Sequence, residues 1–255
     1  MSIIYINPYQ FAAFDPDALT YISAVETADG QALESGVRVA INDFVVGCKS
    51  DGIWNAIKAS CILAGARTLD GALVPLVGGA PTNFNFVSGD YDRETGLVGD
   101  GSSKYLDSNI SGNTPPQDNI HLGLYTNTAS SGIMIGSESP RNSIYAFTTI
   151  SVPLQTNSIP STGVSVSLTG FAGARRDPSN TGSIDWNVFG SSGSISNVSS
   201  NPNSNNFYVF GRNLNAVTDY SGTRIAFYSI GESLDLAALD TRVSNLITAI
   251  GAAIP

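Results

Sequence analysis

Asn206-Phe-Tyr-Val-Phe-Gly211 and Thr223-Arg-Ile-Ala-Phe-Tyr-Ser-Ile230 are two short apolar runs, separated by a stretch that contains Asn, Asp, Ser and Gly. Both runs are rich in aromatic and β-branched residues, which fit a pleated and partly buried strand. The residues between them are those that turns favour. The pair therefore predicts two β-strands joined by a polar connection.

The same texture extends back to Gly71, where short apolar runs alternate with Gly, Asn, Ser and Pro. Strands at this spacing are typical of a β-sandwich or barrel. We predict a mainly β fold, in which Ser191 to Asn206 is a polar loop. The other expected strands are Phe84–Val87, Gly96–Val98, Tyr105–Leu106, His121–Tyr125, Gly132–Ile135, Ser143–Thr148, Val164–Leu168 and Ser183–Val188.

The first 65 residues have a helical texture instead. Asp15-Pro16-Asp17 is a strong helix start, because Asp15 can cap and Pro16 suits the first helical position. Three helices are expected, which end near Gly30, Gly47 and Gly65. A unit of about 60 residues buries a limited share of its surface. We therefore expect these helices to dock on the β domain or on a neighbouring subunit.

A last helix is predicted from Ser233, with Leu236, Leu239, Val243, Leu246 and Ile250 at three- and four-residue steps. Two heptads are too few to establish a coiled coil. The helix either packs on its own sandwich or mediates self-association. Residues 1–70 are thus predicted as a helical N-terminal segment, and residues 71–255 as a β-sandwich that ends in a helix.

Composition narrows the possible partners. The net charge is −9 with a pI near 4.4, so the chain repels phosphate backbones and we expect no nucleic-acid binding. No stretch approaches the ~20 apolar residues of a membrane span, and the N-terminus has no secretory leader pattern. We expect a protein made and kept, or assembled, in the cytosol. Cys48 and Cys61 are expected to be buried thiols, since two Cys and one His cannot form a four-ligand zinc site.

Two segments resemble the beginning and the end of a known domain. Gly96-Leu-Val-Gly-Asp-Gly-Ser-Ser-Lys-Tyr-Leu-Asp107 is similar to the early strand pair of concanavalin-A-like (laminin-G-like) lectin domains of phage structural proteins. The end of that domain resembles Tyr208-Val-Phe-Gly-Arg-Asn213 together with Tyr220-Ser-Gly-Thr-Arg-Ile-Ala-Phe-Tyr-Ser-Ile-Gly-Glu232. Phe44-Val-Val-Gly-Cys-Lys-Ser-Asp-Gly-Ile-Trp54 is similar to segments that precede it in phage and cyanophage proteins of unassigned role.

The resemblance covers roughly residues 72–255 and implies a two-sheet antiparallel jelly roll on a virion. The implied role is a non-enzymatic capsid decoration (cement) protein or a small tail component. This sandwich also hosts lectins and glycosidases. A receptor- or carbohydrate-binding module of a tail fibre or baseplate, with host surface glycans as partner, is therefore the alternative. The first role also predicts contacts with other virion proteins and a homo-oligomer.

Glycosidases on such a fold place carboxylates at alternate positions of one strand. Only Asp90-Tyr-Asp-Arg-Glu94 has that spacing. Asp90, Asp92 and Glu94 could be a catalytic triplet or, because oxygen ligands two apart can converge, a calcium loop. Glycines on both sides favour a solvated turn between two strands. We therefore predict no catalytic, cofactor or metal residue.

The remaining motifs also favour structural roles. His121, the only histidine, is expected on a strand with an ordinary hydrogen-bond partner, on the face opposite Leu122 and Leu124. Gly99 to Lys104 lacks the spacing of a phosphate loop and is predicted as a turn. Arg175-Arg-Asp-Pro178 is predicted as a solvated turn. Five aromatic residues could either stack on sugars or fill the core: Trp54, Tyr125, Tyr145, Trp186 and Tyr208.

Overall fold

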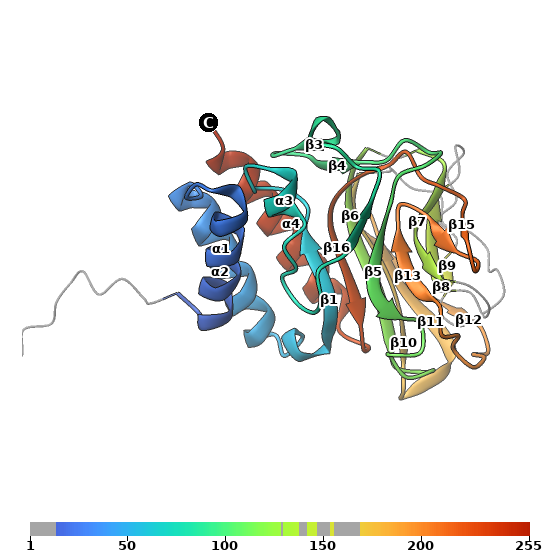
Figure 1. Cartoon of the computed structure of the whole chain (residues 1–255). Coiled ribbons are helices and arrows are strands. Elements are labelled where there is room, and N and C mark those ends of the chain that lie inside the picture. Colours follow the sequence, from blue (N-terminus) through green and yellow to red (C-terminus); the bar gives the residue numbers. More distant parts are fainter. Residues whose placement is uncertain (1–13, 129, 138–141, 147–153, 156–168) are drawn as a thin grey trace, which may run out of the picture.

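The protein is built from three layers, a set of helices and two β-sheets stacked face to face (Figure 1). The computed structural model describes residues 14–128, 130–137, 142–146, 154–155 and 169–255. The predicted mainly β, two-sheet sandwich with N-terminal helices and a C-terminal helix is confirmed.

The helical layer consists of α1 (Pro16–Asp29), α2 (Ser35–Ser50) and α4 (Leu236–Ala253). Asp15 caps α1 through its side chain, and Gly30 ends the helix in the left-handed conformation, as predicted. Asp235 caps α4 by accepting bonds from the backbone N–H groups of Ala237 and Ala238. The shorter helical pieces are η1 (Trp54–Ala56), α3 (Leu69–Ala72) and η2 (Ser88–Asp90).

Sheet A is the central layer. Its strand order is β12-β11-β10-β6-β16-β4-β3, and β1 also pairs with β16. All its pairs are antiparallel. The strands are β1 (Ile57–Ile62), β3 (Tyr91–Asp92), β4 (Gly96–Val98), β6 (Ile120–Thr128), β10 (Gly170–Asp177), β11 (Asn180–Val188), β12 (Ser191–Ser196) and β16 (Arg224–Gly231).

Sheet B is the outer layer, with the order β15-β14-β7-β13-β5-β2 and with β8 and β9 beyond β7. Its pairs are antiparallel except for the parallel contact of β14 with β7. The strands are β2 (Thr82–Phe84), β5 (Tyr105–Ser111), β7 (Gly132–Ser137), β8 (Asn142–Ala146), β9 (Leu154–Gln155), β13 (Asn206–Val209), β14 (Arg212–Asn213) and β15 (Val217–Thr218).

The expected third helix is wrong. Residues 57–62 form β1, an extended strand that pairs with β16 from Ile57↔Gly231 to Ile62↔Phe227. Pairing with a central strand therefore overrides the helical spacing of the local sequence. Both cysteines are buried free thiols, as predicted, but Cys61 lies on a strand, where it contacts the Tyr228 hydroxyl.

Two predicted loops are also wrong in part. Residues 191–196 form β12, which pairs with β11 over its whole length. Arg175 and Arg176 belong to β10, and Arg176 is fully buried rather than solvated. The expected strand Val164–Leu168 lies outside the described residues, as do the last two residues of Ser143–Thr148.

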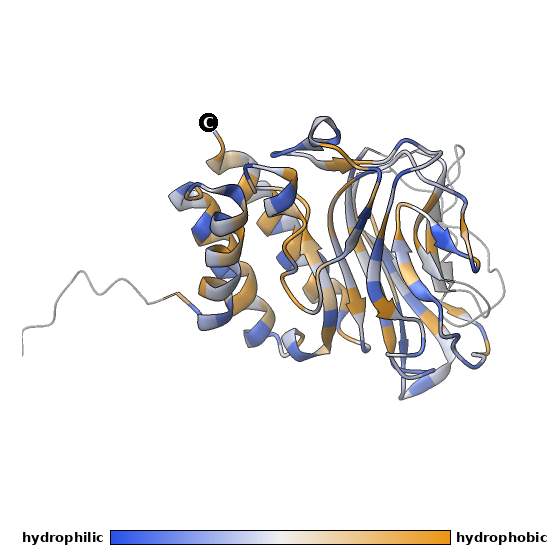
Figure 2. Cartoon of the chain, in the orientation of Figure 1, coloured by the Kyte–Doolittle hydropathy of each residue, from blue (hydrophilic) through white to orange (hydrophobic). Residues whose placement is uncertain are grey.

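The two faces of sheet A contact different cores. One face packs against the helices, and the other packs against the inner face of sheet B. Figure 2 shows hydrophobic residues along the central strands and along the helices beside them. The N-terminal helices thus form a packed cap on the sandwich. Of the two arrangements that the sequence allowed, the structure has the helices docked on the β domain.

Helix α4 and the ring of Phe171 lie over two residues of sheet A that have no side chains of their own. Gly123 of β6 and Gly173 of β10 are cross-strand partners. A Cβ atom at Gly123 would lie 3.3 Å from a methyl of Leu239, and one at Gly173 would lie 3.0 Å from a methyl of Leu236. The paired glycines therefore form the seat on which α4 rests.

We expect Leu239→Ala to lower the free energy of unfolding by about 3 kcal/mol, since it removes a fully buried side chain and leaves a cavity over Gly123. Urea unfolding followed by circular dichroism measures this loss. Leu19→Ala is the matched control, because Leu19 is a helical leucine that is 42% exposed. Equal effects of the two variants would contradict the docking of α4 as an integral layer.

Candidate binding face on the outer sheet

Among the residues that the structure describes, no helix lies over the outer face of sheet B (Figure 1). Strand β5 shows how its residues divide between the two faces. Leu106, Ser108 and Ile110 are buried between the sheets, so the side chains of Tyr105 and Asp107 point to the outside. This outer face is therefore where the sandwich presents side chains to other molecules.

Four aromatic rings gather on this face, and we call them the aromatic cluster: Phe84 of β2, Tyr105 of β5, Tyr208 of β13 and Tyr220. The rings of Phe84 and Tyr105 are parallel with centroids 4.4 Å apart. Tyr208 is 4.7 Å from Tyr105 on its β13 side, and Tyr220 is 6.2 Å from Tyr105. Strands far apart in the sequence thus contribute to one continuous row.

The rings stand upright on the sheet. Neighbouring strands lie about 4.8 Å apart. Parallel rings separated by nearly this distance must therefore stack across the strands, as Phe84 and Tyr105 do. Phe84 is at the end of the row, on the last strand of the described sheet B, and is 37% exposed. The cluster therefore offers a row of ring edges and one accessible ring face.

Asp107 lies beside the aromatic cluster. It is the cross-strand partner of Tyr208 on one side and of Thr82 on the other. Its carboxylate accepts bonds from the Asn206 amide at 3.0 and 3.2 Å and from the Asn109 backbone N–H at 2.8 Å. Partial burial, followed by the nearby negative charge of Asp107, raises the pKa of Tyr208. The Tyr208 hydroxyl therefore stays protonated and can donate a hydrogen bond.

Sequence reasoning found only one member of this cluster, Tyr208. Of the other candidates, Tyr125 and Trp54 pack against the helical core, and the Lys49 ammonium lies 5.7 Å from the Trp54 ring. Trp186 lies against Gly193 on the neighbouring strand. The side chain of Tyr145 is outside the described part. A usable signal was the spacing of Tyr105 and Asp107, which places both on one face of a strand.

The carboxylates at residues 90–94 do not converge. Asp90 ends η2 and Asp92 lies on β3, so the predicted turn is confirmed only for residues 93–95, which include Glu94 and connect β3 to β4. Asp90 pairs with Lys104, and Asp92 accepts bonds from the backbone and hydroxyl of Thr95, which lower the pKa of Asp92. Glu94 points into solvent. Within the described ranges, no three His, Cys, Asp or Glu side chains are grouped to hold a metal ion.

His121 is fully buried on the helix-facing side of sheet A. Its Nδ1 is 2.5 Å from the carbonyl oxygen of Glu232, and its Nε2 is 2.7 Å from the hydroxyl of Ser229. A carbonyl can only accept, so Nδ1 carries the proton and Nε2 accepts from the hydroxyl. This resembles a serine–histidine pair, but Ser229 is also fully buried and no substrate reaches it. The prediction that His121 lies on a strand and has a hydrogen-bond partner is confirmed.

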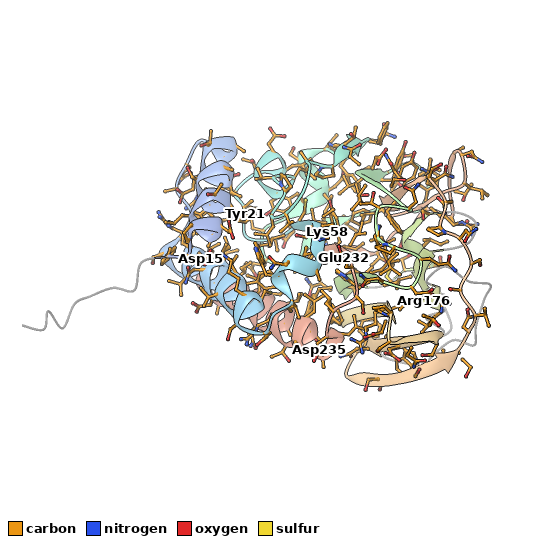
Figure 3. The ribbon with its side chains drawn as sticks, turned by 90° about the horizontal axis from the view of Figure 1, so that it is seen from below. Asp15, Tyr21, Lys58, Arg176, Glu232 and Asp235 are labelled. Carbon is orange, nitrogen blue, oxygen red and sulfur yellow. The ribbon has the colours of Figure 1, made fainter. Side chains whose placement is uncertain are left out.

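An ion pair lies next to His121, at Glu232. The Glu232 carboxylate pairs with Lys58 at 3.0 Å, and Figure 3 shows the two residues next to each other.

Figure 3 also shows Arg176, on β10. Its guanidinium donates to the carbonyl oxygens of Thr181, Ser183 and Asn197. It therefore fixes the residue that follows β12 and acts as a structural clamp.

The Gly99–Lys104 segment is a turn, as predicted. Asp100 accepts bonds from the backbone N–H groups of Ser102, Ser103 and Lys104, and the hydroxyl of Ser103 also donates to it. These donors outweigh burial and hold the pKa of Asp100 well below its usual range.

No helix of the described residues is long and apolar enough to cross a membrane.

Burial lowers the pKa of His121 to about 4, so the folded protein keeps the imidazole neutral while the unfolded chain binds a proton below pH 6.5. We therefore expect the free energy of unfolding to fall by about 3 kcal/mol as the pH drops from 6.5 to 4, since one pKa unit is worth about 1.4 kcal/mol. Urea titrations across this range measure the loss. His121→Gln should remove most of that pH dependence, and an unchanged slope in the variant would contradict the assignment.

No family model matches the chain, and no curated protein sequence matches it. Solved structures with a similar arrangement include a mutant Trypanosoma rangeli sialidase displaying trans-sialidase activity, at 12% identity and a TM-score of 0.41. The match covers 83% of this chain and 39% of that one. The same sialidase in complex with sialic acid matches at 11% identity and a TM-score of 0.44, over 77% and 34% of the two chains. The chain spans well under half of those proteins, and similarity at this level says nothing about function.

Proposed function

We propose that this chain is a non-enzymatic protein of a bacteriophage particle, a decoration protein or small tail component, whose sandwich recognises glycans through the outer face of sheet B. The aromatic cluster carries the recognition part of this proposal. The particle part rests on the resemblance of residues 96–107, 208–213 and 220–232 to phage lectin-like domains.

The architecture supports a division of roles between the two ends of the molecule. The helices pack on one face of sheet A, and sheet B packs on the other face. The outer face of sheet B is left to contact other molecules, and it carries three half-buried tyrosines beside the exposed Phe84. Tyrosine combines a large rigid ring with a hydrogen-bonding tip at low entropic cost, which suits recognition surfaces.

The residues that could do chemistry support a non-enzymatic role. Asp90 and Asp92 are engaged in local contacts, and Glu94 lies apart from them in solvent. Ser229 and His121 are enclosed. A general acid or nucleophile has to reach its substrate. We therefore assign these groups to the structure of the fold.

Glycan recognition predicts that Tyr208→Ala weakens binding to host-surface glycans at least tenfold, because the substitution removes the ring at the β13 end of the cluster. Binding to a glycan array and calorimetry on the sugars that bind measure this effect. Tyr208→Phe keeps the ring and should retain most of the affinity. Val87→Ala, at a position that is 59% exposed and outside the cluster, is the matched surface control. Full binding by Tyr208→Ala would contradict this role.

The particle role predicts that the purified chain adds saturably to phage particles that lack it. Sedimentation of particles with labelled chain measures the stoichiometry. Because sheet B is proposed to face outward, Tyr208→Ala should add to particles as the wild type does while failing to bind glycans. Binding to glycans with no addition to particles would retain the recognition role and overturn the particle role.

A further inference from the structure

We infer that Asp107 sets the charge preference of the aromatic cluster, so that the face binds uncharged saccharides and rejects acidic ones. This inference rests on the proposed function, since it specifies the ligand of the same face. It concerns Asp107, a carboxylate beside the aromatic cluster that, like Asp92 and Asp100 elsewhere on the sandwich, is held by hydrogen bonds and not by an ion pair.

Several carboxylates of the molecule are neutralised by a cation. Asp90 pairs with Lys104, Asp185 with Arg175, and Asp219 with Arg212. Among the ion pairs of the described residues, Asp107 has none. It is held instead by an amide side chain and a backbone N–H, which orient the carboxylate without cancelling its charge. A full negative charge is therefore fixed beside the rings.

Arg212 is the one Lys or Arg on the described strands of sheet B, and it does not compensate this charge. Arg212 of β14 pairs with Asp219, and its side chain is only 14% exposed. The pair contributes one positive and one negative charge, so it leaves the field of Asp107 in place. The net charge of −9 for the whole chain has the same sign. An acidic ligand therefore meets repulsion from the residue and from the molecule.

The same carboxylate suits a neutral sugar. A carboxylate has about four lone-pair sites, and Asp107 uses three of them for Asn206 and Asn109. The remaining capacity can accept a sugar hydroxyl, which is a donor that every pyranose carries. Charged side chains are depleted from the centres of protein interfaces, where they would lose water without a donor. An uncharged sugar supplies hydroxyl donors that replace the water lost by the carboxylate. It can also lie along the upright rings.

The size of the discrimination follows from Coulomb's law. Two like charges about 5 Å apart weaken binding roughly fourfold in water, and by up to a few hundredfold where the effective dielectric constant is about 20. Salt screens such a repulsion between exposed groups. We therefore expect the preference for uncharged sugars to be at least fourfold and to shrink as the salt concentration rises.

The experiment compares gluco-, galacto- and manno-oligosaccharides with their C6-oxidised counterparts, which have the same linkage and differ by a carboxylate. Calorimetry at low and high salt gives the ratio of neutral to acidic affinity for the whole chain. The wild type should prefer the neutral member. Asp107→Asn keeps the shape of the side chain and removes its charge, so the ratio should fall at least fourfold.

Glu94→Gln is the matched control, because it removes one exposed negative charge from the turn of sheet A and leaves the aromatic face intact. Its ratio should equal that of the wild type. Equal binding of neutral and acidic sugars by the wild type, or a ratio unchanged in Asp107→Asn, would overturn the role of Asp107 and leave glycan recognition standing. Failure to bind any sugar of either set, together with a blank glycan array, would overturn both.

Discussion

The central strands of sheet A, β6 and β16, are buried on both faces, and the rest of the structure follows from that constraint. In β16 every residue after Arg224 is buried, up to Gly231. A sheet that is apolar on both faces needs a layer on each side. The helices supply one layer and sheet B supplies the other. The seat for α4 at Gly123 and Gly173 and the enclosure of His121 are consequences of the same requirement.

The fold class could be predicted from the sequence because strand and helix periods are local properties. The strand Gly96–Val98, the cap at Asp15 and the C-terminal helix are all encoded within a few residues. Strand β1 could not be predicted in this way, because its residues fit a helical period and become extended only by pairing with β16. The prediction of a solvated Arg176 is wrong for a different reason. Its charge suggests solvent, but the carbonyl groups that satisfy it come from a hairpin that the sequence does not reveal.

The candidate site shows a similar limit. The place of Tyr208 in it depends on the register between β13 and β5, two strands that are about a hundred residues apart. A list of aromatic residues contains Tyr208 and Trp186 on equal terms, although Tyr208 belongs to a row of neighbouring rings and Trp186 lies against Gly193. Which aromatics can serve recognition is therefore a property of strand pairing. The same holds for Asp107, whose lack of a cation is visible only once its neighbours are placed.

The pairing of β1 with β16 also affects how the protein is made. Cys61 and Tyr228, which touch in the finished sheet, are separated by 167 residues of chain. At ribosomal speeds of roughly 5 to 20 residues per second, the first strand of sheet A waits about 10 to 30 s for its neighbour. During that time β1 lacks its partner strand, and α2 lacks α4, which follows β16 in the chain. Biosynthesis of this sandwich therefore includes an interval in which its earliest segments depend on chaperones, or on their own low tendency to aggregate, until the central strand is released.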